Sequence, residues 1–139
     1  MGHASLAKLL LASGAQVEAR DHQGGTPLHL ACSNGQETTA GVLLSSGAFA
    51  NTVDAKGVTA LHAAAESGSS SMALIMLGQG VAVDTADNDG CTPLHAACRN
   101  GHMILASLLI ANGASLVAKT KAGRTPLHIA CQEGHELMA

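Results

Sequence analysis

The stretch Asp87–Ser115 reads DNDGCTPLHAACRNGHMILASLLIANGAS, and it decides the fold because the chain repeats it. The Thr-Pro-Leu-His segment inside it begins at Thr92 and has counterparts that begin at Thr26, Thr59 and Thr125. Successive threonines are 33 residues apart each time. A fixed period of this length is the signature of stacked supersecondary units.

Other residue types keep the same register around each threonine. Glycine stands two residues before it, nine after it and twenty-one after it, and aspartate stands five before it in three copies. The members of these columns are Gly24, Gly57, Gly90 and Gly123; Gly35, Gly68, Gly101 and Gly134; Gly47, Gly80 and Gly113; and Asp21, Asp54 and Asp87. Thr120 takes the aspartate's place in the last copy, and Gly14 marks an incomplete first copy. Chance does not produce this alignment.

Each unit has a simple physical interpretation. Threonine followed by proline suits the N-cap and the first position of a helix, where a hydroxyl accepts from an orphan amide and proline loses no hydrogen bond. A short helix then runs to a glycine such as Gly35, which tolerates a left-handed C-terminal conformation, and a second helix ends near Gly47. Helices this short are marginal alone. The units must therefore stack on one another, which predicts a solenoid.

The repeated unit resembles the ankyrin repeat, whose signature is D-x-x-G-x-T-P-L-H-x-A-A-x-x-G-H followed by L-L-x-x-G-A. The resemblance covers nearly the whole chain; Ala60 in place of proline and Val81 in place of alanine are departures from it. It implies an all-α solenoid of stacked helix-turn-helix units joined by extended, β-hairpin-like turns. We expect a single domain over 1–139, with full repeats at 21–53, 54–86 and 87–119 and partial repeats at 1–20 and 120–139.

The register also predicts which side chains form the core. We expect the leucine of each Thr-Pro-Leu-His segment and the alanine three residues later to be buried. These residues are Leu28, Leu61, Leu94 and Leu127, with Ala31, Ala64, Ala97 and Ala130. At the two ends we expect apolar side chains around Leu9, Leu10 and Ile129 to be exposed, which would allow self-association through uncapped ends.

The segment Cys91–His102 reads C-x3-H-x2-C-x3-H and has the residue types of a zinc site. The register separates its members, because His95 repeats in every unit, Cys98 lies in a column of small apolar residues and Cys91 lies in a turn column. A His-x-x-Cys pair does recur in three units, but two ligands per layer do not close a tetrahedral shell. We expect no metal, no cofactor and no disulfide, with Cys91 reactive and the other three thiols protected. A metal-binding protein or a Cys/His-dependent enzyme is the alternative function.

Composition excludes several classes of partner. The chain has 139 residues, of which 47% are hydrophobic and 12% charged, and its formal net charge is −3. Lysine and arginine are scattered and Phe49 is the only aromatic residue, so nucleic acid is not expected as a partner. No apolar run is long enough to span a membrane, and the first residues lack the pattern of a signal peptide. We expect an intracellular protein, cytoplasmic or nuclear.

The resemblance implies a non-catalytic module that binds a partner protein or peptide through its hairpin tips and the concave face of its first helices. Carried over by position, the candidate binding residues are Arg20, His22, Gln23, Lys56, Val58, Glu66, Asn88, Asp89, Cys91, Arg99, Asn100, Lys121, Arg124 and Gln132. The alternative for each is ordinary solvated surface. The resemblance also places Asn51 in the column where ankyrin repeats can be substrates of an asparaginyl hydroxylase.

Opposite charges occupy neighbouring turns of the third and fourth copies. Asp84, Asp87 and Asp89 are followed one period later by a basic group. That group consists of Lys119, Lys121 and Arg124. The two clusters either neutralise each other or face complementary charges on a partner, and the sequence leaves both alternatives open.

Overall fold

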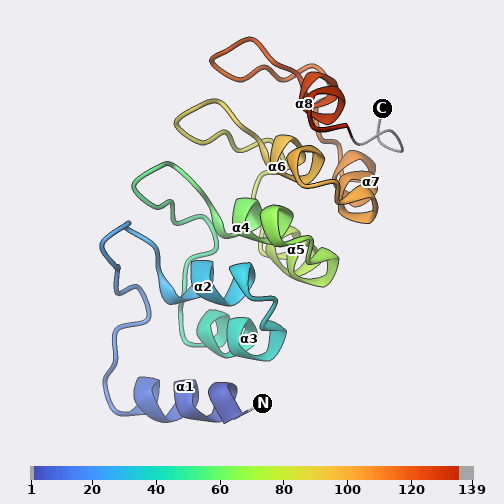
Figure 1. Ribbon diagram of the computed structural model, residues 1–139. Coiled ribbons are helices and arrows are strands. Elements are labelled where there is room, and N and C mark those ends of the chain that lie inside the picture. The colour runs from blue at the N-terminus through green and yellow to red at the C-terminus, as the bar shows by residue number, and fades with distance from the viewer. Residues whose placement is uncertain (1, 135–139) are drawn as a thin grey trace.

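The computed structural model describes residues 2–134, and in this part of the chain eight helices and no strands are found. In chain order the helices are α1 (Gly2–Ala12), α2 (Pro27–Ser33), α3 (Glu37–Ser45), α4 (Ala60–Ser67), α5 (Ser70–Gly78), α6 (Pro93–Arg99), α7 (Met103–Ala111) and α8 (Pro126–Glu133). Figure 1 shows them as a stack that rises from α1 to α8, with the long connections projecting on one side. The all-α solenoid expected from the sequence is confirmed.

Two kinds of helix alternate in the stack. The first helices α2, α4, α6 and α8 pack on one another in order, and α3, α5 and α7 each pack on the first helix of their own unit. The helix α1 is a second helix that packs on α3. None of the described helices has the length and apolar character that a bilayer crossing requires.

The threonines begin the first helices as the sequence predicts. Thr92 has extended backbone angles of φ −94° and ψ 168°, and its hydroxyl accepts a hydrogen bond from the backbone N–H of His95. Proline occupies the start of α2, α6 and α8, where the missing N–H costs nothing. Ala60 takes that place in α4, which begins at the same point. The departure at Ala60 therefore leaves the helix boundary unchanged.

The core lies between the two columns of helices. Leu28, Leu61 and Leu94 are buried, and so is the whole alanine column, which confirms most of the expected core. Leu127 is 53% exposed, so its expected burial is wrong. The reason is its position in the stack. Leu94 on α6 is covered by the second helix α7, whereas no helix after α8 is described that would cover Leu127. The expected second helix after α8 lies outside the described residues.

The ends of the stack differ from expectation in one further place. Leu9 and Leu10 are exposed as predicted, but Ile129 is buried. Ile129 belongs to the column of Ala96 in α6, and α8 packs on α6. Leu30, the member of that column in α2, is 56% exposed because no first helix precedes α2 among the described residues. This column therefore faces the preceding first helix, which covers Ile129.

Candidate functional site

Each long connection contains a tight turn, which the column aspartate holds in three of the four copies and Thr120 in the last. The Asp87 Oδ1 atom accepts hydrogen bonds from the backbone N–H groups of Asp89 and Cys91, both at 2.9 Å. The Asp87 N–H donates to the Cys91 carbonyl at 2.8 Å and closes the turn. Asp21 and Asp54 make the same pair of side-chain bonds. We call these turns, residues 20–25, 53–58, 86–91 and 119–124, the hairpin tips.

Neighbouring hairpin tips are joined to one another by backbone hydrogen bonds. One N–H of each tip donates to a carbonyl of the preceding tip at 2.9 to 3.0 Å. The pairs are Ala55 to Gln23, Asn88 to Lys56 and Lys121 to Asp89. The approach is close, since a Cβ atom at Gly24, where φ is +79°, would lie 2.8 Å from the Ala55 nitrogen. The four tips therefore form one continuous strip with fixed spacing.

The column histidines fasten this strip to the helices. In the repeat 54–86 the His62 Nδ1 atom accepts the Thr59 N–H at 3.1 Å, so the proton of the neutral ring lies on Nε2. His62 Nε2 then donates to the Cys91 carbonyl of the next tip at 2.9 Å. His29 and His95 make the equivalent bonds to the Val58 and Arg124 carbonyls. The column histidines therefore have a structural role, because each joins the start of a first helix to the next hairpin tip.

Burial changes the protonation of two of these rings. Desolvation by burial is the main cause that lowers the pKa of His62 and of His95 below the ordinary value for histidine. Hydrogen bonds to the carbonyls of Cys91 and Arg124 act in the opposite direction and do not offset it. Both rings therefore remain neutral at physiological pH, with both ring nitrogens engaged.

A second row of side chains runs along the first helices. It consists of Ser33, Glu66, Arg99 and Gln132, one from each unit, and all four are exposed. We call it the first-helix row. Arg99 Nη1 lies 3.8 Å from Glu66 Oε1, and Arg99 Nη2 lies 3.4 Å from the Cys91 sulfur. At the next level the Arg124 guanidinium donates to Gln132 Oε1. These contacts connect the row with the adjoining hairpin tips.

The structure places most of the predicted binding residues on this combined surface. The exposed ones are Arg20, His22, Gln23, Lys56, Glu66, Asn88, Asp89, Arg99, Asn100, Lys121, Arg124 and Gln132. Val58 is half-buried. Whether these side chains contact a partner stays a prediction.

Cys91 is buried, so its expected exposure on the turn is wrong. The reason is that its N–H, its carbonyl and its sulfur each have a partner in the surrounding structure. Its N–H donates to Asp87, its carbonyl accepts from His62 and its sulfur contacts Arg99. Cys131, which was expected to be protected, is instead exposed on α8.

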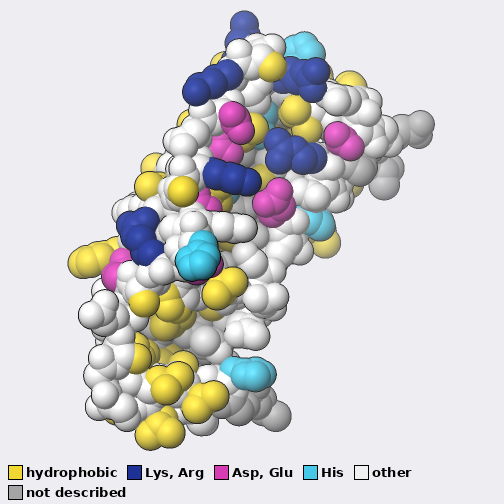
Figure 2. Space-filling view, turned by 60° about the vertical axis from the view of Figure 1, so that its left-hand side comes forward, with side chains coloured by type: hydrophobic (Ala, Val, Ile, Leu, Met, Phe, Trp, Pro, Cys, Tyr) yellow, Lys and Arg dark blue, Asp and Glu magenta, His cyan; other side chains and the backbone are white. Residues whose placement is uncertain are grey.

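The carboxylates of the third tip and of Asp84 just before it do not all have the same role as the exposed charges. Asp84 accepts a hydrogen bond from the Ser115 N–H at 2.9 Å, and Asp87 holds its own turn, so both carboxylates have structural roles. Asp89 and Lys121 are exposed. Within residues 2–134 no ion pair joins these aspartates to the basic residues of the fourth tip. Figure 2 shows acidic and basic side chains interspersed over this face.

The four cysteines are unpaired, and the Cys32 and Cys98 side chains are buried. Burial raises the pKa of the Cys32 thiol to about 12 and raises that of Cys98 as well. In the part of the chain that the structure describes, no group of three or more histidine, cysteine or carboxylate side chains is arranged to hold a metal ion.

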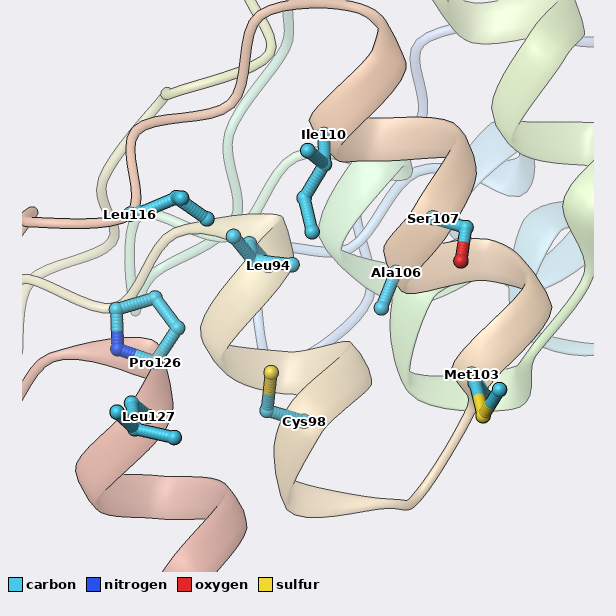
Figure 3. Close-up of a pocket in the computed structure, with 9 residues that line it drawn as sticks. All are labelled: Leu94, Cys98, Met103, Ala106, Ser107, Ile110, Leu116, Pro126 and Leu127. Carbon is cyan, nitrogen blue, oxygen red and sulfur yellow. The ribbon is translucent and has the colours of Figure 1, made fainter. Parts of the chain in front are cut away.

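Sequence analysis missed a groove at the far end of the stack. It has a volume of about 360 Å³, and its walls come from α6, α7, the following loop and α8. The apolar side chains that form it include Leu94, Met103, Ala106, Ile110, Leu116 and Leu127 (Figure 3). The repeat register could have indicated the groove. The leucine column of Leu94 and Leu127 is covered by the second helix of each unit, and α8 is the last helix described. We call this surface the end groove.

Comparison with known families agrees with the geometry. A family model that describes three copies of the ankyrin repeat matches residues 1–87 and again residues 71–139. No curated protein matches the chain. The two matches together extend over the full length, and the stacked helix pairs have the architecture that the repeat implies. The chain therefore belongs to the ankyrin repeat family.

Proposed function

We propose that the chain is a non-catalytic module that binds an extended segment of a partner protein along the hairpin tips and the first-helix row. Ankyrin repeats are generally protein–protein interaction modules, and the family is typically not enzymatic. The observation that carries the proposal is the strip of hydrogen-bonded tips. Its backbone is the same in each unit, whereas the exposed side chains differ from one unit to the next. A rigid scaffold with variable side chains supports specific binding at low entropic cost.

The charges of the strip suggest the chemistry of the partner segment. Asp89 and Lys121 are adjacent, because the Lys121 N–H donates to the Asp89 carbonyl at 2.9 Å, yet no ion pair joins their side chains within the described residues. A segment that crosses these two tips would carry a basic group opposite Asp89 and an acidic group opposite Lys121. Complementary charges of this kind act mainly on the rate of encounter and on specificity.

The candidate catalytic groups support binding in preference to catalysis. The rings of His62 and His95 use both nitrogens in structural hydrogen bonds, so neither ring is available as a general base. The Cys32 and Cys98 thiols are buried and have raised pKa values, which disfavours the thiolate needed for nucleophilic attack. Four unpaired thiols also suit a reducing compartment, the cytoplasm or nucleus.

Charge reversal on the fourth tip tests the proposal. The chain is used to capture a partner, and association kinetics are then measured for wild type, for Lys121→Glu and for Lys8→Glu. Lys8 is an exposed lysine on α1, outside the proposed surface, so it controls for the change in net charge. We expect Lys121→Glu to slow association about tenfold at low salt and less at high salt, with unchanged helix content. We expect Lys8→Glu to have little effect.

A second pair of variants decides whether the correct face has been chosen. Arg124→Glu changes the same tip, and Arg99→Ala changes the first-helix row. If association is unaffected by Lys121→Glu and by both of these variants, the partner binds another face of the solenoid and the proposal is wrong.

A further inference from the structure

The fourth hairpin tip lacks the carboxylate that holds the other three. In each of those tips one oxygen of the column aspartate accepts the backbone N–H groups two and four residues later, at 2.8 to 3.0 Å. In the fourth tip the hydroxyl of Thr120 accepts only the second of them, the Arg124 N–H, at 3.2 Å. The first, the Ala122 N–H, has no acceptor among residues 2–134. The fourth tip is therefore short of one negative charge and one hydrogen-bond acceptor.

The same tip concentrates positive charge. Lys119, Lys121 and Arg124 lie within six residues, and the tip contains no acidic side chain, whereas each of the other three tips contains an aspartate. The Thr120 N–H donates to the Arg124 carbonyl at 2.9 Å, so the two arms of the tip lie side by side and all three basic side chains start from one turn. Figure 2 shows basic side chains gathered at the upper end of the molecule, where Figure 1 places this tip.

These properties belong to the tip itself. The missing carboxylate is local, because each of the first three tips satisfies the equivalent N–H with its own aspartate. Lys119 and Lys121 stand at positions that are exposed in the inner tips as well, where the residues are Val53, Ala86, Ala55 and Asn88. Their exposure therefore does not depend on what lies beyond α8.

We propose that the fourth tip binds a phosphoryl group, carried by a phosphorylated side chain of the partner segment. A phosphorylated serine or threonine brings a charge of about −2 and three acceptor oxygens. Three cations and an open backbone N–H match that group, because lysine, arginine and backbone N–H groups all donate to phosphate oxygens. A carboxylate brings one charge and would leave two cations unmatched. The nature of the carrier rests on the proposed function, whereas the phosphoryl site does not.

The neighbouring tip favours a narrow protein segment over a membrane with phosphorylated headgroups. The third tip is joined to the fourth by the hydrogen bond from the Lys121 N–H to the Asp89 carbonyl, at 2.9 Å. It carries Asp87 and Asp89, and Asp89 is exposed. A flat anionic surface would approach both tips together and be repelled by these carboxylates. A segment can place one phosphoryl group on the fourth tip alone.

Amide resonances in two-dimensional NMR spectra test the site. Inorganic phosphate and acetate are titrated at constant ionic strength and slightly alkaline pH. We expect the Ala122 N–H resonance to move with phosphate, with a midpoint at about a tenfold lower concentration than with acetate. The equivalent resonances of Gln23, Lys56 and Asp89 should stay in place, because column aspartates already accept these N–H groups.

Thr120→Asp supplies the missing carboxylate and should keep the fold, because aspartate holds the other three tips. We expect it to displace the Ala122 resonance without phosphate and to abolish the response. Lys121→Ala should weaken phosphate binding about fivefold, and Lys56→Ala on the second tip is the matched control. The site is refuted if Ala122 does not respond in the wild type, if acetate acts as strongly as phosphate, if Thr120→Asp still responds, or if both lysine variants behave alike.

A second set of probes identifies the carrier. A short glycine peptide with one phosphoserine should move the Ala122 resonance, and its unphosphorylated form should not. Vesicles of phosphatidylcholine that contain phosphatidylinositol phosphates should not sediment the protein. Binding to the vesicles, or no response to the phosphorylated peptide, overturns the assignment to a protein segment. Since none of these probes is the captured partner, their failure is distinct from failure of the proposed binding face, which the association kinetics of Lys121→Glu test.

Discussion

Cys32, Cys98 and Cys131 occupy one column of the repeat, yet their environments differ. Cys32 and Cys98 are buried, and Cys131 on the last described helix is exposed. Burial disfavours the charged thiolate, which is why the pKa of Cys32 rises to about 12 and that of Cys98 rises too. The chemical reactivity of a residue type is thus set by its level in the stack.

We expect Cys131 to react first with a thiol-specific disulfide reagent. Its side chain is accessible, whereas the sulfurs of Cys32, Cys91 and Cys98 are buried and react only through local opening. Stopped-flow measurement of thiol modification in the folded protein should show one fast phase. Cys131→Ser should remove that phase and Cys91→Ser should leave it intact. A fast phase that survives Cys131→Ser would contradict this assignment.

At the scale of elements, each column histidine joins the start of a first helix to the next hairpin tip. The His95 Nδ1 atom accepts the Thr92 N–H at 3.1 Å, and Nε2 donates to the Arg124 carbonyl at 3.0 Å. Protonation would place a hydrogen on Nδ1 and remove the acceptor for the threonine N–H. Burial opposes that protonation in the folded state, as the lowered pKa values of His62 and His95 indicate.

Stability should therefore decline in mild acid. Below pH 6.5, the ordinary histidine pKa, the unfolded chain binds protons at these positions and the folded chain does not. The unfolded state then holds more protons, so the free energy of unfolding decreases as the pH is lowered from 6.5 towards the lowered folded-state pKa. Above pH 6.5 the contribution of these neutral histidines to stability is complete. Each histidine contributes a slope of up to about 1.4 kcal/mol per pH unit. Urea unfolding at a series of pH values measures it.

Substitution of one column histidine separates its contribution to the acid-dependent loss of stability from that of the other titrating groups. His62→Gln should lower stability at neutral pH and reduce the slope in mild acid, because one buried titrating group is gone. His22→Gln changes an exposed histidine on the first hairpin tip and should leave the slope as it is. Equal slopes for His62→Gln and wild type would show that the column histidines do not govern the acid response.

At the scale of the whole molecule, the contribution of a column side chain to the free energy of unfolding depends on its level in the stack. Leu94 and Leu127 are the same residue type at the same repeat position, and one is 1% exposed while the other is 53% exposed. In a stacked array each unit gains its stability from interfaces with its neighbours. The interior leucine is covered on both sides, whereas the outer one retains an open side at the end groove.

We expect Leu94→Ala to cost about 2 to 5 kcal/mol, as other buried leucine truncations do. Leu127→Ala should cost less than about 1 kcal/mol, because its side chain loses little buried area. Urea unfolding of dilute protein compares the two, with the low concentration chosen to avoid association. Similar losses for both variants would mean that the last unit is packed as tightly as the inner ones.

Much of the candidate site could be derived from the sequence, because it depends on interactions within one unit. The turns at Asp21, Asp54 and Asp87 are held by side-chain bonds that span four residues or fewer, so each unit contains all that its turn needs. The sequence did not show which charged side chains form hydrogen bonds within the fold and which remain exposed. Asp84 and Asp89 look alike in the sequence, but the structure engages the first with the Ser115 N–H and leaves the second exposed.

The fold itself was determined by the sequence alone, since the 33-residue period, the N-cap threonines and the turn glycines are all local signals. Only the tertiary structure decided which members of a column are covered. Leu127 is open and Ile129 is buried because the atoms that bury a side chain here belong to a neighbouring helix. A repeat register assigns the same environment to every copy, and that assignment holds only where the neighbouring helix that covers the column is present among the described residues.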